Sequence, residues 1–212
     1  MRFEEWSPIY ERILSDFGYD RRQDETSARL LRTLMVNADI IDDDELSQSI
    51  ADRVYVLGAA DTLRDEMHGR VFDGTIISAG SATAVVMDEG IVPDIVVTDL
   101  DGDVKSQIEA SRKGAITLIH AHGDNADAIM QYSKSFTGKV VLTTQSKPDN
   151  LLRNYGGFTD GDRAYCMAKH FGASDIVLLG FDFDHPSYKD GSDPDVKLRK
   201  LRWAREIIGS VR

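Results

Sequence analysis

The spacing of apolar positions separates the start of the chain from the rest. In residues 1–50, apolar side chains recur at the three-to-four-residue spacing of amphipathic helices, namely Trp6, Ile9, Tyr10, Ile13, Leu14 and Phe17, then Leu30, Leu31, Leu34 and Met35. No convincing run of strand-forming residues lies among them. The pattern predicts a helical N-terminal appendage of two or three helices.

From Arg53 onward the pattern changes to short β-branched runs, most of them separated by a stretch long enough for a helix. These runs predict strands at Val54–Leu57, Thr75–Ser78, Asp94–Thr98, Ile116–Ile119, Val140–Thr143 and Ile176–Leu179. Strands that alternate with helices form mostly parallel sheets with right-handed crossovers. We therefore expect an α/β domain over residues 51–212, a three-layer fold with about six strands and with helices on both faces of the sheet.

The composition is that of an ordinary globular protein, with 42% hydrophobic and 29% charged residues in a chain of 212. No apolar run approaches the roughly 20 residues that span a bilayer, and Glu4 and Glu5 stand where a secretory signal would be basic. The single cysteine, Cys166, excludes an intrachain disulfide and suits a reducing compartment. These features predict a cytoplasmic protein that does not enter a membrane.

A net charge of -11 repels polyphosphate, which argues against general nucleic-acid binding. The charge does not exclude a single nucleotide. Many acidic residues cluster at the predicted strand ends, where a bound metal ion would invert the local field.

Two carboxylates, Asp99 and Asp101, follow the third predicted strand. Side chains two apart on a strand point to the same face, so these two should share one small volume and repel each other. A divalent cation relieves this repulsion, and hard oxygen ligands suit Mg²⁺ better than Zn²⁺. The alternative is a polar turn, which also takes Asp and Gly readily.

Other strand ends are polar as well, and ligands of open α/β sheets lie beyond the carboxyl ends of the strands. His120, His122 and Asp124 are two apart and leave a zinc site open as an alternative. Asp124 and Asp127 open a predicted helix, where a carboxylate is either a cap or a ligand. The first, fifth and sixth strands end in Gly58–Asp61, Thr143–Gln145 and Gly180–Asp184.

Two further segments bear on phosphate binding. The glycine-rich stretch from Gly156 to Ala164 runs into a predicted helix, whose start attracts phosphate and where Arg163 adds a charged donor; Asp160 or Asp162 is either the N-cap or a ligand. On the predicted helix Asp195–Ile208, Lys197 and Lys200 share a side. They either form a solvated face or reach a polyphosphate in the cleft.

The ordered set of motifs VPDIVVTDLDG, HAHGDN, TTQ, GGFTDGDRA and LLGFDFD, between Val92 and Asp184, resembles the archaeal 6-hydroxymethyl-7,8-dihydropterin pyrophosphokinases. It is similar, more distantly, to the thiamine pyrophosphokinases, which share part of that fold. The resemblance implies transfer of a diphosphate from ATP to the hydroxymethyl group of a reduced pterin, with release of AMP.

The resemblance also implies roles for individual residues. The Mg²⁺ ligands would be Asp99, Asp101 and Asp124, while Asp127 or His122 would orient or deprotonate the hydroxyl group. Asn125 and Gln145 would read the edge of the pterin or of adenine. The remaining predicted substrate or nucleotide contacts are Gly58, Gly157, Asp160, Asp162, Arg163, Lys197 and Lys200.

Two turns depart from the family. A Gly-x-Gly-Pro-Ser-Leu turn usually follows the first strand, whereas this chain has Gly58-Ala59-Ala60-Asp61-Thr62-Leu63; the turn after the second strand, Ser78–Ala82, lacks an acidic residue. We therefore expect the chemistry to rest on the third to fifth strands. The alternatives are a thiamine pyrophosphokinase, a sugar-nucleotide-binding domain and a non-catalytic nucleotide-binding domain. A homo-oligomer stays open.

Overall fold

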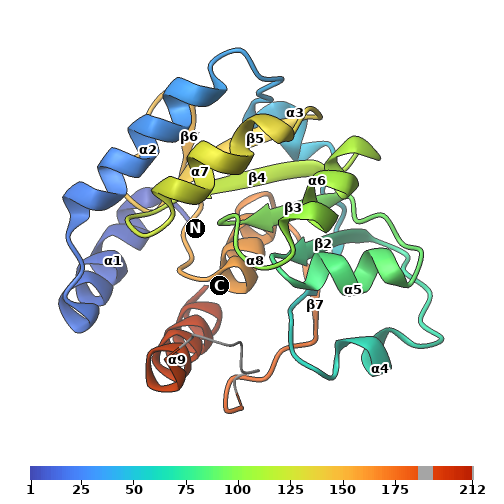
Figure 1. Ribbon diagram of the computed structural model, residues 1–212. Coiled ribbons are helices and arrows are strands. Elements are labelled where there is room, and N and C mark those ends of the chain that lie inside the picture. Colours follow the sequence, from blue (N-terminus) through green and yellow to red (C-terminus); the bar gives the residue numbers. More distant parts are fainter. Residues whose placement is uncertain (186–192, 212) are drawn as a thin grey trace.

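The computed structural model describes residues 1–185 and 193–211. Within these residues lies one sheet of seven strands, in the order β6-β5-β4-β3-β2-β1-β7, and every pairing between neighbours is parallel (Figure 1). The strands are β1 (Arg53–Leu57), β2 (Thr75–Ala79), β3 (Ile95–Thr98), β4 (Ile116–Ala121), β5 (Val140–Thr144), β6 (Leu152–Arg153) and β7 (Asp175–Leu179). The α/β sheet predicted from the sequence is confirmed.

Six of these strands are the predicted ones, with ends that differ by one or two residues. The seventh, β6, is two residues long and pairs with the end of β5, Leu152 beside Leu142. A strand this short has no hydrophobic period, so the sequence pattern could not reveal it.

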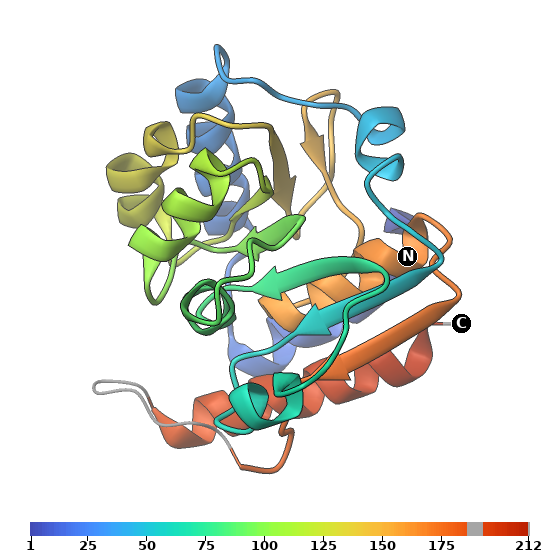
Figure 2. The ribbon, with the colours of Figure 1, turned by 90° about the vertical axis from the view of Figure 1, so that its right-hand side faces the viewer.

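Helices cover both faces of the sheet (Figure 2). On one face lie α3 (Asp43–Ser47) and α8 (Asp160–His170), with α1 (Phe3–Phe17) and α9 (Pro194–Ser210) packed on the outer side of α8. The other face carries α2 (Arg21–Met35), α4 (Leu63–Met67), α5 (Ala82–Asp88), α6 (Val104–Arg112) and α7 (Ala126–Tyr132). This is the expected three-layer arrangement. No helix in the described ranges has the length and apolar character needed to cross a membrane.

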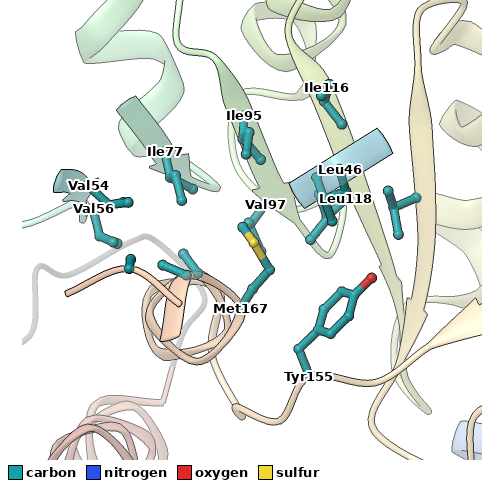
Figure 3. Packing of buried hydrophobic residues seen from close by; sticks show 14 of the residues in the cluster. Leu46, Val54, Val56, Ile77, Ile95, Val97, Ile116, Leu118, Tyr155 and Met167 are labelled. Carbon is teal, nitrogen blue, oxygen red and sulfur yellow. The ribbon is translucent and has the colours of Figure 1, made fainter. Parts of the chain in front are cut away.

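The strands are apolar on both faces because helices bury both. In β1, Val54 and Val56 face the α8 side, where they join Met167 (Figure 3). Tyr55 and Leu57 point to the other face and pack with α4 and α5. Burying a side chain of this size contributes about 1.5–3 kcal/mol. The continuous apolar strands seen in the sequence are thus the signature of a doubly covered parallel sheet.

The N-terminal helices pack closely on the rest of the fold, α2 on the sheet and α1 on α8 and α9. Leu31 and Met35 of α2 lie in the core formed with β4, β5 and α7, and the chain after α2 makes a parallel bridge at Ile40 with Val140 of β5. Trp6 and Tyr10 of α1 are fully buried against α8 and α9. The helical segment expected over residues 1–50 is present, and its separation from residues 51–212 as a domain stays a prediction.

The strand order places a crevice beside β1. The chain builds the sheet outward from β1 to β6 and then returns, so that β7 adds on the opposite side of β1. At this reversal Gly58 follows β1 and Gly180 follows β7, and the N–H of Gly58 donates to Leu179 O (2.8 Å). A Cβ on Gly58 would stand 2.6 Å from Gly180 O, so only glycine permits this close approach. Reversals of this kind are where open α/β sheets bind ligands.

Candidate active site

A cavity of about 430 Å³ lies at the carboxyl ends of the strands beside this reversal. It is lined by glycine turns, carboxylates, lysines and aromatic rings, among them Gly58, Gly80, Asp99, Asp101, Phe158, Asp160, Gly180, Phe181, Asp182, Phe183, Lys197 and Lys200. A smaller hollow of about 30 Å³ is lined by Tyr19, Asp20, Gln23, Asp24, Asp99, His122, Gly123, Asp124, Gln145, Phe158, Arg163 and Lys200. Asp99, Phe158 and Lys200 belong to both, so the two spaces adjoin.

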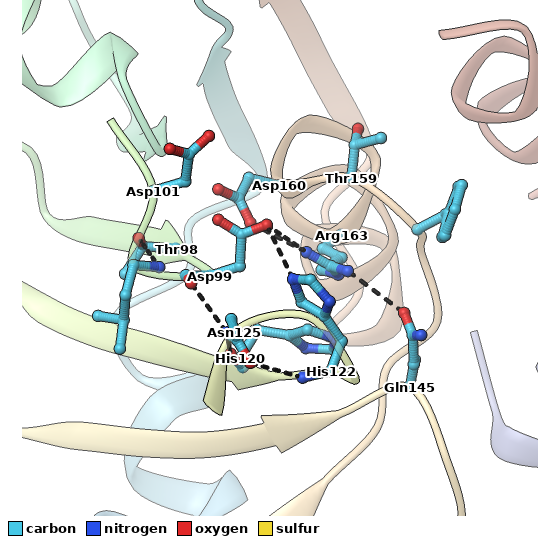
Figure 4. Close-up of polar contacts among 12 residues, drawn as sticks. Thr98, Asp99, Asp101, His120, His122, Asn125, Gln145, Thr159, Asp160 and Arg163 are labelled. Carbon is cyan, nitrogen blue, oxygen red and sulfur yellow. Dashed lines mark hydrogen bonds and ion pairs between the residues drawn. The ribbon is translucent and has the colours of Figure 1, made fainter. Parts of the chain in front are cut away.

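Asp99 and Asp101 both line the larger cavity, but the reason differs from the one predicted. Strand β3 ends at Thr98, so neither carboxylate lies on a strand and the argument from strand spacing was wrong. A turn brings them together instead, because Leu100 is left-handed (φ 66°) and its N–H donates to Thr98 Oγ1 (2.8 Å) (Figure 4). A left-handed residue other than glycine costs roughly 1–2 kcal/mol. Burial of the Leu100 side chain offsets that cost.

The surroundings of Asp99 hold it in the charged form. Its Oδ2 lies 3.4 Å from His122 Nε2 and 3.9 Å from Arg163 Nη1. Burial by itself would raise the pKa of Asp99, but the hydrogen bond from His122 and the charge of Arg163 outweigh it and hold the pKa well below its usual range. A permanent carboxylate therefore stands where the two spaces meet.

Asp160 lies close by, and its pKa is shifted in the opposite direction. It opens α8, and its Oδ1 is 3.1 Å from Arg163 Nη1. Burial and the nearby charge of Asp99 raise the pKa of Asp160 well above its ordinary value, more than Arg163 lowers it. Since two adjacent carboxylates ionise together only at a cost, Asp160 takes up the proton that Asp99 does not.

Arg163 is a buried cation that the sequence analysis placed at a phosphate site. Besides Asp160 and Asp99, its Nη2 donates to Gln145 Oε1 (3.4 Å). Gly157 (φ 96°) makes room for it, because a Cβ there would stand 2.5 Å from the Arg163 Cα. Within the described residues, buried Arg163 Nε and His120 Nε2 have no hydrogen-bond partner. Unpaired buried polar atoms of this kind favour the binding of a polar ligand atom or a solvent molecule.

The predicted shared face of His120, His122 and Asp124 is only partly formed, because β4 ends at Ala121. The rings of His120 and His122 are 6.2 Å apart, while Asp124 is exposed. His120 is buried beside Thr143 (3.0 Å), and burial, followed by the charge of Arg163, lowers its pKa well below 6.5. In the part of the chain that the structure describes, no three His, Cys, Asp or Glu side chains are grouped as metal ligands. The zinc alternative, like the set of three carboxylates for Mg²⁺, therefore stays a prediction.

The structure gives several predicted residues a supporting contact. The Asn125 amide donates to Asp99 O (2.8 Å) and His120 O (2.7 Å) and accepts from His122 N (3.0 Å), so it braces the two loops that carry the site. The N-cap of α8 is Thr159, so the prediction that Asp160 or Asp162 is the N-cap was wrong. Asp162 is the third residue of the helix, where it completes the capping box and accepts from the N–H groups of Phe158 and Thr159. Asp160 and Asp162, which the sequence left interchangeable, thus differ: the first lines the cavity and the second belongs to the capping box.

The remaining predicted residues divide between the cavity and the surface. Lys197 and Lys200 of α9 line the larger cavity, so their side of the helix is not simply a solvated face. Asp127, in the first turn of α7, is exposed. Asp124 lines only the smaller hollow of the two, away from Asp101.

Sequence reasoning missed the contribution of the N-terminal helices. Asp24 of α2 is only 3% exposed and lines the smaller hollow. A signal was present, because Asp24 lies four and seven residues before Ala28 and Leu31, on the buried face of its helix. A carboxylate at such a position is rarely buried without a specific partner.

The oxygen donors of the larger cavity fit Mg²⁺. Nucleotide-bound Mg²⁺ is usually held by one or two carboxylates together with substrate phosphates and water. Asp99 and Asp101 would supply those carboxylates, and Asp99 is already held in its charged form. A third carboxylate from the protein is not needed for this arrangement.

The fold and the site define a parallel α/β protein whose polar ligand site lies at the carboxyl edge of the sheet, the usual place in this class. The chain belongs to the family described as "6-hydroxymethylpterin diphosphokinase MptE-like", whose model matches residues 31–187.

Relatives of nearly the same length are similar to this chain along almost all of its sequence. It is 43% identical to the 6-hydroxymethyl-7,8-dihydropterin pyrophosphokinase of Pyrococcus furiosus, over 98% of this chain and 93% of the relative. It is 41% identical to the protein of that name from Methanothermobacter thermautotrophicus, over 98% and 94%. For the one from Methanocaldococcus jannaschii the identity is 34%, over 100% and 96%.

Among solved structures, the chain is similar to the MAf glycosyltransferase of Magnetospirillum magneticum AMB-1, with a TM-score of 0.51 and 16% identity. The match covers 76% of this chain and 30% of that one. At this level of identity the likeness concerns the fold alone.

Proposed function

We propose that this protein transfers the diphosphate group of ATP to the hydroxymethyl oxygen of 6-hydroxymethyl-7,8-dihydropterin and releases AMP, with Mg²⁺ as its cofactor. The relatives that carry this activity in their names match almost the whole chain. The structural observation that carries the proposal is the position of Asp99, a charged carboxylate at the junction of two adjoining spaces. A two-substrate transfer needs such a meeting point.

The reaction makes and breaks one bond to phosphorus. The hydroxymethyl oxygen attacks the β-phosphorus of ATP, the bond from that phosphorus to the α,β-bridging oxygen breaks, and AMP leaves with that oxygen. The proton of the hydroxyl group is released to solvent. Such transfers depend on in-line positioning and on neutralising the charge of the phosphates. Bound Mg²⁺ would neutralise much of the negative charge on the phosphates. Lys197 and Lys200, which line the larger cavity, would neutralise the rest.

The two spaces differ in the ligand they suit. The larger cavity offers the close glycine turns at Gly58 and Gly180, two lysines and the ring of Phe181, which fits a nucleoside triphosphate. The smaller hollow presents carboxylates, the Gln145 amide and the rings of Tyr19 and Phe158. A reduced pterin is flat and offers both donors and acceptors along its edge. A hollow of about 30 Å³ is too small for the whole ring, so we assign only the reactive end of the pterin to this side of Asp99, with the ring extending into the larger cavity.

His122 orients Asp99 in this proposal. Its Nδ1 accepts from the N–H of Asp124 (3.3 Å), which leaves the proton of a neutral ring on Nε2, the atom that faces Asp99. A ring with that tautomer donates to the carboxylate and has no free nitrogen toward it. This tautomer does not support the predicted role in which His122 deprotonates the hydroxyl group, because no free ring nitrogen faces the site. The other predicted role, in which His122 orients that hydroxyl group, stays a prediction.

We further infer a cytoplasmic enzyme that acts on small molecules and binds neither nucleic acid nor membrane. Its net charge of -11 and its single, buried cysteine fit that setting.

The test is an acceptor comparison with ATP as donor, scored by AMP and ADP. We expect the pterin to give AMP with a kcat/KM at least about a hundredfold above that for thiamine, a difference of roughly 2.7 kcal/mol. Thiamine is the appropriate competitor, because its cationic thiazolium would gain from the acidic site. Equal or better turnover of thiamine would contradict the pterin assignment, and formation of ADP would contradict diphosphate transfer. A sugar nucleotide in place of ATP should give no product.

A further inference from the structure

Asp24 gathers three hydrogen bonds from three different parts of the fold. Its carboxylate accepts from the Tyr10 hydroxyl of α1, from Gln145 Nε2 just beyond β5 (2.9 Å), and from the N–H of Gly123 in the loop after β4 (2.7 Å). The residue is 3% exposed. A buried carboxylate needs donors of this kind, so α2 is fixed to two segments that carry the candidate site.

The Gln145 amide is held at both ends. Its Nε2 donates to Asp24, and its Oε1 accepts from Arg163 Nη2 (3.4 Å). Its backbone is fixed as well, because Trp6 Nε1 donates to Gln145 O (2.8 Å). An amide has donors on one side and an acceptor on the other, so only one orientation satisfies both neighbours. Asp24 selects the orientation that presents an acceptor to Arg163.

Arg163 continues the connection to the reacting region. Its Nη1 lies 3.1 Å from Asp160 Oδ1 and 3.9 Å from Asp99 Oδ2, and Figure 4 shows the guanidinium between these carboxylates and Gln145. Asp99 is the group that the proposed function places beside the transferred diphosphate. A continuous series of contacts therefore runs from Asp24 through Gln145 and Arg163 to Asp99.

We infer that Asp24 is a positioning residue for the diphosphate transfer: it fixes the Gln145 amide and thereby holds the Arg163 guanidinium beside Asp99 and Asp160. This inference rests on the proposed function. An asparagine at position 24 has one oxygen and one N–H₂ group. If the oxygen keeps the bond from the Gly123 N–H, the N–H₂ group faces the Gln145 amide. The Gln145 amide would then turn over and present its own donors to Arg163, which would lose an acceptor.

The test compares Asp24→Asn, Gln145→Met and the double variant with wild type. Both single changes break the same connection, so each should lower kcat by about 10- to 100-fold, while KM for ATP stays within about threefold. This loss is smaller than the roughly 10²–10³-fold that follows removal of a direct transition-state donor, because both residues act through Arg163. Because the two act through one path, the double variant should be no slower than the slower single variant.

Tyr155→Phe is the matched control. It also removes a hydrogen bond between a tyrosine and an aspartate of the N-terminal segment, from Tyr155 to Asp43 (2.8 Å), but it lies away from both spaces. It should lower the melting temperature and leave kcat unchanged. A purely structural role for Asp24 predicts the same behaviour for Asp24→Asn, or additive losses in the double variant, and either result overturns the inference.

A second measurement does not depend on turnover. The Nε–H resonance of Arg163 in a ¹⁵N–¹H spectrum should shift in Asp24→Asn and Gln145→Met, but not in Tyr155→Phe; an unchanged resonance overturns the inference. If the wild type forms no AMP, the proposed function fails and this spectrum alone decides the connection. If Asp24→Asn does not fold, Gln145→Met carries the test, and a kcat within twofold of wild type overturns the inference.

Discussion

At the scale of single residues, neighbouring carboxylates differ because their partners differ. Asp99 faces His122 and Arg163 and keeps a low pKa, whereas the pKa of Asp160 is raised by burial and by the charge of Asp99. Asp162, two residues further, is buried in the capping box of α8. The same side chain thus serves as a permanent charge, as a carboxyl group that holds its proton more tightly, and as part of a capping box within one site.

Replacing Asp99 tests its role as a Mg²⁺ ligand. Asp99→Asn should lower kcat/KM by about 10²–10³-fold, because a charge is lost where phosphoryl charge develops, and the fold should stay intact. Asp124→Asn is the comparison, since Asp124 is exposed and lines only the smaller hollow. Its loss should be far smaller. A loss as large as that of Asp99→Asn would make Asp124 a Mg²⁺ ligand after all. Full activity of the wild-type enzyme in excess EDTA would show that the reaction needs no metal ion.

Asp160 makes stability depend on pH. The folded protein holds the Asp160 proton more tightly than the unfolded chain, whose aspartate pKa is about 3.9. The stabilising contribution of this group is therefore complete below that value and is lost as the pH rises through the raised folded pKa. Asp160→Asn mimics the protonated form, so its melting temperature should exceed that of wild type at pH 7 in metal-free buffer, and the difference should shrink toward pH 4. A difference that is constant with pH would contradict the raised pKa.

The sequence could identify which residue types form the site, but not how they divide the work. The sequence analysis found the pair Asp99 and Asp101, but it argued from the side-chain spacing of a strand, and β3 ends at Thr98, before both residues. The left-handed Leu100 that unites them has no sequence signal, because leucine rarely adopts that conformation and only the tertiary packing imposes it. The partners of Asp24 lie 14 to 121 residues away in the chain, beyond the reach of any local pattern.

At the scale of elements, the start of α8 sets the position of Arg163. Gly157 lets the loop approach the helix at Arg163, and Thr159 and Asp162 form the capping box that begins the helix. The spacing of Thr159 and Asp162 was the available sequence signal, but the sequence analysis placed the N-cap at Asp160 or Asp162 instead. The two-residue strand β6 was not, because it follows only from pairing with β5.

Gly157→Ala tests that close approach. The change adds a Cβ that would stand 2.5 Å from the Arg163 backbone, and alanine would have to adopt the positive φ that glycine has there. The change should therefore lower the free energy of unfolding by about 3 kcal/mol. Gly90→Ala is the matched control, since Gly90 also has a positive φ (77°) but nothing within 4 Å of an added Cβ. It should cost only about 1 kcal/mol. Chemical denaturation measures both, and equal costs would contradict the packing argument at Gly157.

At the scale of the whole molecule, the first two helices lie on opposite sides of the sheet and meet the site from both. Trp6 and Tyr10 of α1 pack on the α8 side, while Leu31 of α2 packs on the other face with α7. Their apolar stripes predicted burial, and burial was found. A stripe does not specify the surface it covers, so the contacts of Tyr10 with Asp24, and of Asp24 with Gln145, could come only from the structure.

The most direct test of the account follows the phosphorus atoms in one turnover. Enzyme in excess is mixed with Mg²⁺, 6-hydroxymethyl-7,8-dihydropterin and ATP labelled at the β-phosphorus, and the products are separated. The account predicts that the label leaves with the pterin as a diphosphate ester and that unlabelled AMP forms in equal amount. Label recovered in ADP, or in free diphosphate with the pterin unchanged, would contradict diphosphate transfer to the pterin.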